Sequence, residues 1–202
     1  MQLARAARRL NQSAGSALPA LVLLTDDERL ADPLAAVRAL PRGSLVVLRA
    51  RDRDRRVALA DALARLAFGH GLAWIIADDA PLAQRAGAHG AHFPEQKIAS
   101  LARWRARQPH WLITSSAHSL GACIRAGRAG ADAVLLGPVF ATHSHPHRAG
   151  IGPVRARLIA RLTGVPVYAL GGVDAHSALR LAGAHLAGLA AIGGLGLDES
   201  DA

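Results

Sequence analysis

Two glycine pairs near the C-terminus could bind a phosphate group. Each pair follows a short apolar run: Gly171 and Gly172 come after Val167–Leu170, and Gly193 and Gly194 come after Ala187–Ala190. Glycine has no Cβ, so the backbone N–H groups of a glycine turn can approach phosphate oxygens closely. One such pair would be explained by a tight turn alone. Two pairs after successive predicted strands favour a phosphate site built from both turns.

A second group of candidate residues is basic. Side chains alternate along a strand, so Val47, Arg49 and Arg51 would share one face. If this face points into a cavity, two guanidinium groups converge there. A buried guanidinium group needs an anionic partner, which either the Asp78 carboxylate or a ligand phosphate would supply. The alternative is a pair of surface arginines at the end of a strand.

Histidines and hydroxyls alternate in the segment 142–148, which reads THSHPHR. Three histidines at alternate positions could surround a metal ion. We favour another interpretation, in which Thr142, Ser144 and His145 face a phosphate group or a centre of proton transfer. Histidine suits proton transfer because its ordinary pKa lies near neutral pH.

The charge balance also favours an anionic ligand. The 202 residues carry 24 basic and 15 acidic side chains, for a net charge of +9, and Lys97 is the only lysine. Arginine prefers bidentate contact with phosphate and carboxylate groups. The arginine-rich segment 49–56 is short and contains Asp52 and Asp54, and no nucleic-acid-binding motif is present. We therefore expect small phosphorylated heterocycles as partners, and no nucleic acid.

The remaining composition excludes several classes of protein. Hydrophobic residues make up 51% of the chain, which is too much for a disordered protein. No apolar run approaches the ~18 residues of a membrane helix, so we expect no membrane partner. The N-terminus lacks the apolar core of a secretory signal. Cys123 is the only cysteine, which excludes an internal disulfide and fits a cytoplasmic protein.

These candidates must be positioned by alternating strands and helices. Eight apolar runs predict strands, at Ala20–Thr25, Leu45–Ala50, Ala73–Ala77, Ala91–Phe93, Leu112–Ser115, Ala133–Leu136, Val167–Leu170 and Ala187–Ala190. Seven helices are predicted between them, at Asp32–Leu40, Arg55–Gly69, Pro81–Ala86, Ile98–Arg107, Ser119–Ala129, Pro153–Leu162 and Ala175–Ala182. This alternation predicts a parallel sheet. Eight strands favour a compact (β/α)8 TIM barrel over a doubly wound sheet, which needs fewer.

The two ends of the chain depart from a regular barrel. We expect residues 1–17 to form a helical arm, 18–197 the barrel and 198–202 a tail. Few good helix formers follow Ile192, so the barrel should lack most of its last helix. The N-terminal helix at Gln2–Leu10, or a second subunit in a homodimer, should cover the apolar surface that this leaves.

In a TIM barrel, the chemistry takes place at the carboxyl ends of the strands. This edge would carry Asp78 after the third strand, Glu95 and Lys97 after the fourth, and Ser116 and His118 after the fifth. These side chains would therefore lie near the two arginines and the glycine turns.

At these same positions the sequence resembles the thiamine-phosphate synthase family and its relative, the thiazole tautomerase. The resemblance runs from about Leu21 to Gly194 and is carried by LLTD at 23–26, VLRAR at 47–51, IIADD at 75–79, GAHGAHF at 87–93, SSAHS at 115–119, GADAVLLGPVFATHS at 130–144 and PVYALGGV at 166–173. The last two stretches are the most specific. Pro138 stands where the tautomerase has a histidine, as in the synthase.

The resemblance implies a transferase of thiamine biosynthesis, which joins a pyrimidine methyl pyrophosphate to a thiazole phosphate. It implies that Mg²⁺ at Asp78 helps pyrophosphate to leave, and that the thiazole nitrogen attacks the pyrimidine carbocation. The implied pyrophosphate ligands are Arg49, Arg51 and Ser116, and further catalytic candidates are His118 and His145. The implied thiazole-phosphate ligands are Thr142, Ser144, Gly171, Gly172, Gly193 and Gly194.

The sequence departs from the family pattern at several positions. The family's Val-Ser after the eighth strand is replaced near Ala190–Gly194, where a glycine-rich backbone is kept. Val47 replaces a glutamine that contacts the pyrimidine, and Ala77 replaces an asparagine beside the metal-binding aspartate. Lys97 replaces the second metal-binding aspartate, and its charge would repel Mg²⁺, although Glu95 nearby could substitute. His145 replaces a lysine. The phosphate-binding positions persist, so we expect a divergent member of the family.

Three functions are open at this point. The first is a synthase-type transferase. The second is an isomerase that moves a proton within one thiazole phosphate, with His118, His143 and His145 as acid and base. The third is a protein that binds a phosphorylated ligand without turnover, which would appear as stabilisation by the ligand without product.

Overall fold

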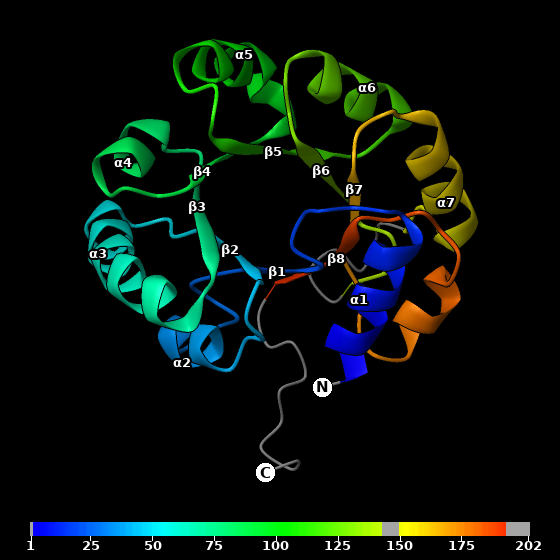
Figure 1. The fold of residues 1–202 in the computed structure, drawn as a ribbon, viewed down its shortest axis with the longest axis horizontal. Helices are drawn as coiled ribbons and strands as arrows, with labels where there is room; N and C mark the ends of the chain where they lie inside the picture. The colour runs from blue at the N-terminus through cyan, green and yellow to red at the C-terminus, as the bar shows by residue number, and fades with distance from the viewer. Residues whose placement is uncertain (1, 143–149, 193–202) are drawn as a thin grey trace.

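The computed structural model describes residues 2–142 and 150–192. Strands and helices alternate along this part of the chain, and the helices surround the strands (Figure 1). Each strand is parallel to its neighbours, and the first strand pairs with the last, so the sheet closes. The predicted (β/α)8 TIM barrel is therefore confirmed.

The strands lie where the apolar runs predict them. They are β1 Leu21–Leu24, β2 Leu45–Leu48, β3 Ala73–Ala77, β4 Gly90–Phe93, β5 Leu112–Ala117, β6 Ala133–Leu136, β7 Val167–Leu170 and β8 Gly188–Ile192. Alternate side chains point into the barrel, as Val22 and Val47 do, whereas Leu23 and Val46 pack against the helices. Two apolar cores result, one inside the barrel and one between strands and helices.

Helices occupy six of the seven predicted positions. They are α2 Pro33–Arg38, α3 Arg53–His70, α4 Ala80–Arg85, α5 Ile98–Arg107, α6 Leu120–Arg128 and α7 Pro153–Leu162, with a short 3₁₀ turn, η1, at Glu95–Lys97 before α5. Polar residues fix where several of them begin. The Asp79 side chain accepts a hydrogen bond from the Leu82 N–H group, and Ser119 accepts one from Ala122. Such caps satisfy free donors at a helix start and hold the preceding loop in place.

The seventh predicted helix, Ala175–Ala182, is wrong in kind. Its place is taken by a 3₁₀ helix, η2, at Ser177–Leu181. The Ser177 hydroxyl donates to the Gly172 carbonyl and accepts from the Asp174 N–H group, which keeps the start of the segment in a turn. Gly183 then ends it with φ +71°. Only five residues remain for the helix, so a full α-helical turn pattern does not develop.

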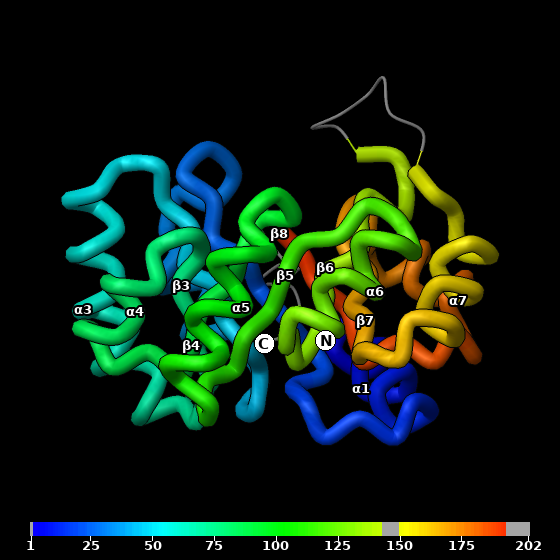
Figure 2. The backbone as a smooth tube through the Cα atoms, turned by 90° about the horizontal axis from the view of Figure 1, so that it is seen from above, coloured from blue at the N-terminus to red at the C-terminus, as the bar shows by residue number. Residues whose placement is uncertain are grey.

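The N-terminal arm is a helix, α1 Gln2–Ser13, that packs against β1, β8 and η2. Its buried side chains are Leu3, Ala4, Ala7 and Leu10. The prediction that this helix covers the surface near the last strand is confirmed. Its connection to β1 runs across one end of the barrel, opposite the end that carries the loop after β6 (Figure 2). The predicted truncation of the last helix concerns residues 193–202, which lie outside the described residues.

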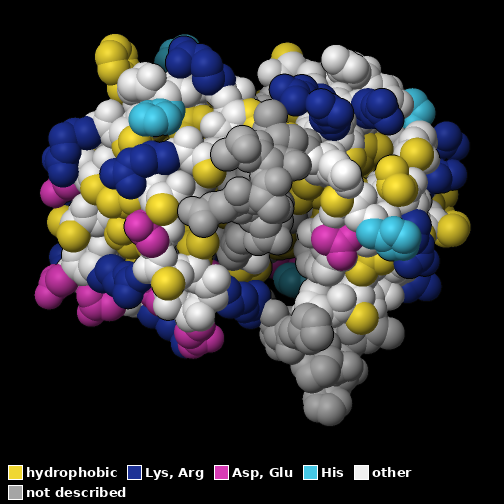
Figure 3. Space-filling model, turned by 90° about the horizontal axis from the view of Figure 1, so that it is seen from below, with side chains coloured by type: hydrophobic (Ala, Val, Ile, Leu, Met, Phe, Trp, Pro, Cys, Tyr) yellow, Lys and Arg dark blue, Asp and Glu magenta, His cyan; other side chains and the backbone are white. Residues whose placement is uncertain are grey.

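The outer surface shows where the positive charge lies. Basic side chains are spread among apolar and acidic ones on the face in Figure 3, and they form no continuous stripe there. Among the described residues, no helix is long and apolar enough to cross a membrane.

Candidate active site at the barrel mouth

The mouth cavity is a hollow of about 430 Å³ at the carboxyl ends of the strands. It is lined by Leu24, Asp26, Asp27, Glu28, Arg49, Ala50, Arg51, Arg56, Ala77, Asp78, His92, Pro94, Ser116, His118 and Leu170. Five of the predicted site residues thus meet in one cavity: Arg49, Arg51, Asp78, Ser116 and His118. Its volume lies within the range of sites for small ligands.

The two arginines after β2 reach the mouth as predicted, and each has a carboxylate partner. Arg49 Nη2 lies 3.1 Å from Asp26 Oδ2, and the Asp26 side chain is only 8% exposed. Arg51 Nη1 lies 2.5 Å from Glu28 Oε1, and both of these side chains are mostly exposed. The first pair is therefore part of the cavity wall, whereas water weakens the second.

The loop after β1 supplies the acids that hold this basic group. Asp27 accepts a hydrogen bond of 2.7 Å from the Arg51 N–H group and pairs with Arg55 at 3.2 Å. Arg56 donates to the Ala50 carbonyl and pairs with Asp79 at 3.3 Å. The sequence-based assignment gives no role to Arg56 or to these acids. The signal that could have found them is a cluster of acids, DDE at 26–28, directly after a strand.

His92 is a further residue that the sequence-based assignment misses. It is buried, its Nδ1 lies 2.8 Å from the Thr114 hydroxyl, and its Nε2 lies 2.9 Å from the Ser116 hydroxyl. Burial, and then the positive charge of Arg49, lower the pKa of His92 from 6.5 to about 4. The ring is thus neutral at pH 7, with one donor and one acceptor nitrogen.

This neutral ring orients the Ser116 hydroxyl. If Thr114 donates to Nδ1, then Nε2 carries the proton and donates to Ser116, whose own O–H is left to point at a ligand. The register that pairs His92 with Thr114 brings the three side chains together on the inner face of the barrel. No spacing within one strand reveals this contact, because it depends on two strands.

The predicted metal ligands do not face one another as carboxylates. Asp78 Oδ1 lies 2.6 Å from Lys97 Nζ. Glu95 Oε2 lies 2.7 Å from His118 Nδ1 and accepts a hydrogen bond from the His118 N–H group, and Glu95 Oε1 pairs with Arg125 at 3.3 Å. Within the described part of the chain, no three side chains of the metal-binding types converge. Magnesium favours a site of oxygen ligands, and an ammonium group against Asp78 does not fit one.

The glycine turn after β7 has a clear packing reason. Gly171 and Gly172 have φ of +90° and +63°. A Cβ on Gly171 would lie 2.8 Å from Pro138, and one on Gly172 would lie 2.5 Å from the Ala141 carbonyl oxygen. Thr142 is beside this turn, 3.4 Å from the Gly171 Cβ position. The turn and the loop after β6 therefore form one unit, next to Leu170 in the cavity wall.

Several predicted site residues are not in the wall of the mouth cavity. Glu95, Thr142, Gly171 and Gly172 are absent from its lining. His143, Ser144, His145, Gly193 and Gly194 lie outside the described residues.

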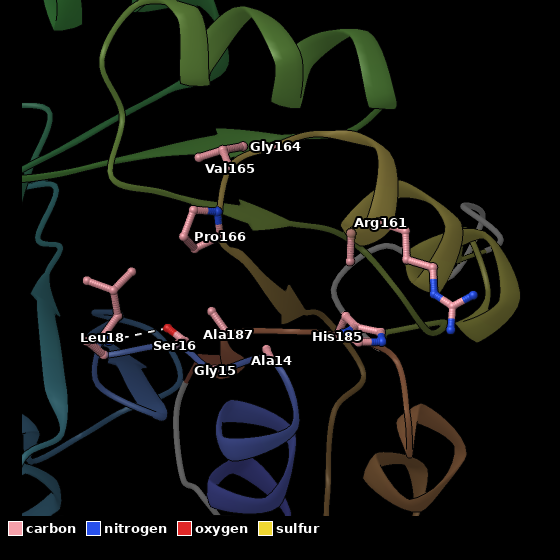
Figure 4. Close-up of a pocket in the computed structure, with 12 residues that line it drawn as sticks. Ala14, Gly15, Ser16, Leu18, Arg161, Gly164, Val165, Pro166, His185 and Ala187 are labelled. Carbon is pink, nitrogen blue, oxygen red and sulfur yellow. Dashed lines mark hydrogen bonds between the residues drawn. The ribbon is translucent and has the colours of Figure 1, made fainter.

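A larger hollow, the base cavity, lies at the opposite end of the barrel and holds about 740 Å³ (Figure 4). It is lined by residues 14–18, Ala160, Arg161, residues 164–166, His185 and Ala187. In the close-up its wall is mostly small side chains and backbone, with Arg161 and His185 on one side.

The fold and the mouth define a (β/α)8-barrel protein with a charged cavity at the carboxyl ends of its strands. The pattern of the family described as Thiamine monophosphate synthase matches residues 21–195. The chain therefore belongs to this family.

Known relatives agree with this result. The chain is 36% identical over 177 residues to a thiamine-phosphate synthase of Thioalkalivibrio sulfidiphilus, which covers 81% of each chain. It is 34% identical over 175 residues to a thiamine-phosphate synthase of Chromobacterium violaceum, covering 84% of this chain and 83% of that one. A solved structure of thiamine phosphate pyrophosphorylase from Pyrococcus furiosus has the same fold, with a TM-score of 0.75, 22% identity, and coverage of 85% of this chain and 84% of that one.

Proposed function

We propose that this protein is a thiamine-phosphate synthase-type transferase. It joins a pyrimidine methyl pyrophosphate to a thiazole phosphate and releases pyrophosphate. The observation that carries the proposal is the meeting of Arg49, Arg51 and Ser116 in one mouth, beside the glycine turn after β7. Membership of the family and the names of the relatives support the same reaction.

The β2 side of the mouth would hold the pyrophosphate. Arg51 is exposed and its pair with Glu28 is weakened by water, so a ligand with several negative charges can displace that carboxylate. Arg49 can bind a phosphoryl oxygen while it keeps Asp26, because a guanidinium group has five N–H donors. Ser116, oriented by His92, would donate a third hydrogen bond.

The β6 and β7 side would hold the thiazole phosphate. Thr142 lies beside the turn at Gly171 and Gly172, and amide groups there can donate to an oxyanion. Gly193, Gly194 and Ser144 are proposed to complete this subsite. The two phosphates would then stand on opposite sides of the cavity, with the reacting carbon and nitrogen between them.

The chemistry needs little from acid or base groups. The bond between the pyrimidine methylene carbon and the pyrophosphate oxygen breaks, and its electron pair stays on that oxygen. The thiazole nitrogen then gives its lone pair to the carbon. Cationic side chains that bind the departing oxygen more strongly as its charge grows would accelerate this step. His118, held by Glu95, and His145 are proposed as hydrogen-bonding groups around the leaving pyrophosphate.

The test supplies both phosphorylated substrates to the purified protein, with EDTA and separately with Mg²⁺, and measures thiamine phosphate and pyrophosphate. The proposal expects both products in equal amounts. Turnover of the thiazole phosphate alone would instead identify the isomerase. Thermal stabilisation by either substrate, without any product under either condition, would identify the non-catalytic binder.

We further propose a cytoplasmic location and pairing of two copies into a homodimer. Small phosphorylated heterocycles are the proposed partners. The resemblance also implies Mg²⁺ at Asp78, with Glu95; the ion pair of Asp78 with Lys97 does not fit such a site, and no step above depends on the ion.

A further inference from the structure

The only lysine of the chain occupies an unfavourable position for a helix. Lys97 is the last residue of the turn η1 and comes directly before α5, and its side chain makes no capping hydrogen bond to the amides of that helix. Helix starts favour Ser, Thr, Asp or Asn at this position, and they disfavour positive charge. The chain uses arginine for its other basic side chains. A lysine placed here therefore needs a reason other than the stability of α5.

The partner of Lys97 is Asp78, in the loop after the neighbouring strand β3. Lys97 Nζ is 2.6 Å from Asp78 Oδ1, and Asp78 lines the mouth cavity. Lys97, 51% exposed, is not among the lining residues itself and stands at the rim beside Asp78, which is 43% exposed. An ammonium group has three N–H donors, and Asp78 uses one of them. The remaining donors could bind an anion held beside Asp78.

We propose that the Lys97 ammonium group takes the place of a divalent metal ion at the pyrophosphate side of the mouth. This inference rests on the proposed transferase function. As the carbon–oxygen bond breaks, the electron pair moves to the pyrophosphate oxygen, and Lys97 binds the resulting charge together with Arg49 and Arg51. Pyrophosphate leaves as the anion, so no proton transfer and no further reactant are needed.

Electrostatic repulsion supports the replacement of a metal ion by Lys97. A metal ion at Asp78 would sit within a few ångströms of the Lys97 ammonium group, and like charges at that distance repel strongly. Other acids near the mouth already have basic partners, since Asp26 binds Arg49, Asp27 binds Arg55, and Glu95 binds His118 and Arg125. In the described part of the rim, these carboxylates therefore bind basic side chains and are not free to bind a metal ion.

The first experiment is calorimetric titration of the full chain with inorganic pyrophosphate, once with EDTA and once with excess Mg²⁺. We expect the native protein to bind pyrophosphate in EDTA, with no gain from Mg²⁺. Lys97→Ala should weaken binding in EDTA about tenfold, the value of one charge-assisted contact. Lys97→Asp should bind pyrophosphate only when Mg²⁺ is present. Arg161→Ala, which removes one positive charge at the base cavity, is the control and should match the native protein.

A second experiment needs no mutant and reads Lys97 directly. Selective ¹⁵N-lysine labelling gives a single side-chain ammonium signal, because Lys97 is the only lysine of the chain. Pyrophosphate in EDTA should shift this signal, because the anion would accept hydrogen bonds from the labelled ammonium group. A purely structural pair with Asp78 would leave the signal unchanged.

Two results would overturn the inference. One is a native protein whose pyrophosphate affinity rises tenfold or more with Mg²⁺. The other is pyrophosphate binding in EDTA that leaves the Lys97 signal unmoved and survives Lys97→Ala. Titration of thiazole phosphate into the same samples distinguishes a failure of the transferase function from a failure of the role proposed for Lys97. If neither ligand binds, the transferase function itself fails. If thiazole phosphate binds but pyrophosphate needs Mg²⁺, only the role of Lys97 fails.

Discussion

The cavities at the two ends of the barrel differ more in charge than in size. The base cavity holds about 740 Å³, and the only ionisable side chains in its described lining are Arg161 and His185. The mouth cavity holds about 430 Å³, and its ionisable lining consists of Asp26, Asp27, Glu28, Arg49, Arg51, Arg56, Asp78, His92 and His118. Of these two cavities, the smaller one therefore has most of the described ionisable side chains in its lining.

The difference follows from how each cavity is built. The base cavity lies where the connection from α1 to β1 crosses the barrel end. The Asn11 side chain, in α1, donates hydrogen bonds to the Leu18 carbonyl of that connection at 2.9 Å and to the Ala187 carbonyl at 2.7 Å. This cavity is the space left beside the N-terminal arm, where α1 connects to β1. The mouth cavity instead collects the side chains that follow the strands, where parallel strands bring their ends together. The larger volume is therefore not at the end where the charged side chains gather.

The largest expected effect contrasts one arginine at each end. Arg49→Ala should lower kcat/KM for thiamine phosphate formation on the order of 10²–10³-fold, because it removes a donor to the developing charge. It also leaves the buried Asp26 carboxylate without this partner. Arg161→Ala at the base cavity should stay within about twofold of the native protein. Steady-state kinetics with both substrates checks this.

Equal losses in the two variants would break the comparison, since the base cavity would then share the function. A soluble, folded Arg49→Ala protein with native kcat/KM would remove Arg49 from the proposed site. Circular dichroism on both variants separates a loss of activity from a loss of fold.

Burial of His92 in the mouth should make the folded protein less stable in acid. His92 is neutral in the folded chain, with a pKa of about 4, whereas the unfolded chain binds a proton near pH 6.5. Its contribution to stability is therefore complete above pH 6.5 and is lost as the pH falls from 6.5 to about 4. The loss should amount to about 3 kcal/mol, which urea unfolding at a series of pH values measures.

His92→Gln provides the comparison for this titration. Glutamine can donate and accept a hydrogen bond but does not titrate, so the unfolding free energy of the variant should depend less on pH in this window. An identical pH dependence in the two proteins would show that other groups cause the acid loss.

Two glycines, one at each end of the barrel, allow the cost of a packing clash to be compared with the cost of backbone strain alone. Gly172 at the mouth and Gly164 at the base have φ of +63° and +66°. A Cβ on Gly172 would lie 2.5 Å from the Ala141 carbonyl oxygen, whereas a Cβ on Gly164 would meet nothing within 4 Å. Gly164→Ala should therefore cost only the left-handed backbone, about 1 kcal/mol. Gly172→Ala should cost about 2–4 kcal/mol, because the loop after β6 must move as well.

Thermal unfolding of both variants measures this difference, and titration with thiazole phosphate adds a functional readout. The affinity of Gly172→Ala should fall, while that of Gly164→Ala should not change. Equal stability losses would mean that the β6 loop yields easily, and that the glycine turn is not a fixed binding surface.

Local sequence patterns predict most of the barrel because its elements are local. Apolar runs such as Val134–Leu136 predict strands, and their count already predicts closure of the sheet. The prediction of a helix at Ala175–Ala182 is wrong, because hydrogen bonds of Ser177 with Gly172 and Asp174 hold the start of the segment in a turn despite its helix-forming residues. Propensity is a weak guide where a side chain competes for the backbone.

The site is less predictable because its contacts join different strands. The alternation that starts in β2 predicts one shared face for Arg49 and Arg51, and both residues line the mouth cavity. The pairs of Lys97 with Asp78 and of Glu95 with His118 depend on how neighbouring loops meet, as does the position of His92 between Thr114 and Ser116. Residue types at strand ends identify the candidates, and only the closed barrel identifies their partners.

The smallest predicted effect tests whether the base cavity has a function of its own. His185 has φ +48°, a left-handed conformation that costs a residue with a Cβ about 1 kcal/mol. Strain of this kind often marks functional positions, so the base cavity deserves a direct comparison with the mouth. His185→Gly removes the strain but also makes the unfolded chain more flexible, so the net gain in unfolding free energy should be about 0.5 kcal/mol. If the side chain serves packing alone, kcat/KM stays native and the protein becomes slightly more stable by urea unfolding. A stabilised variant with reduced kcat/KM would instead assign a role to the base cavity and end the contrast between the two ends.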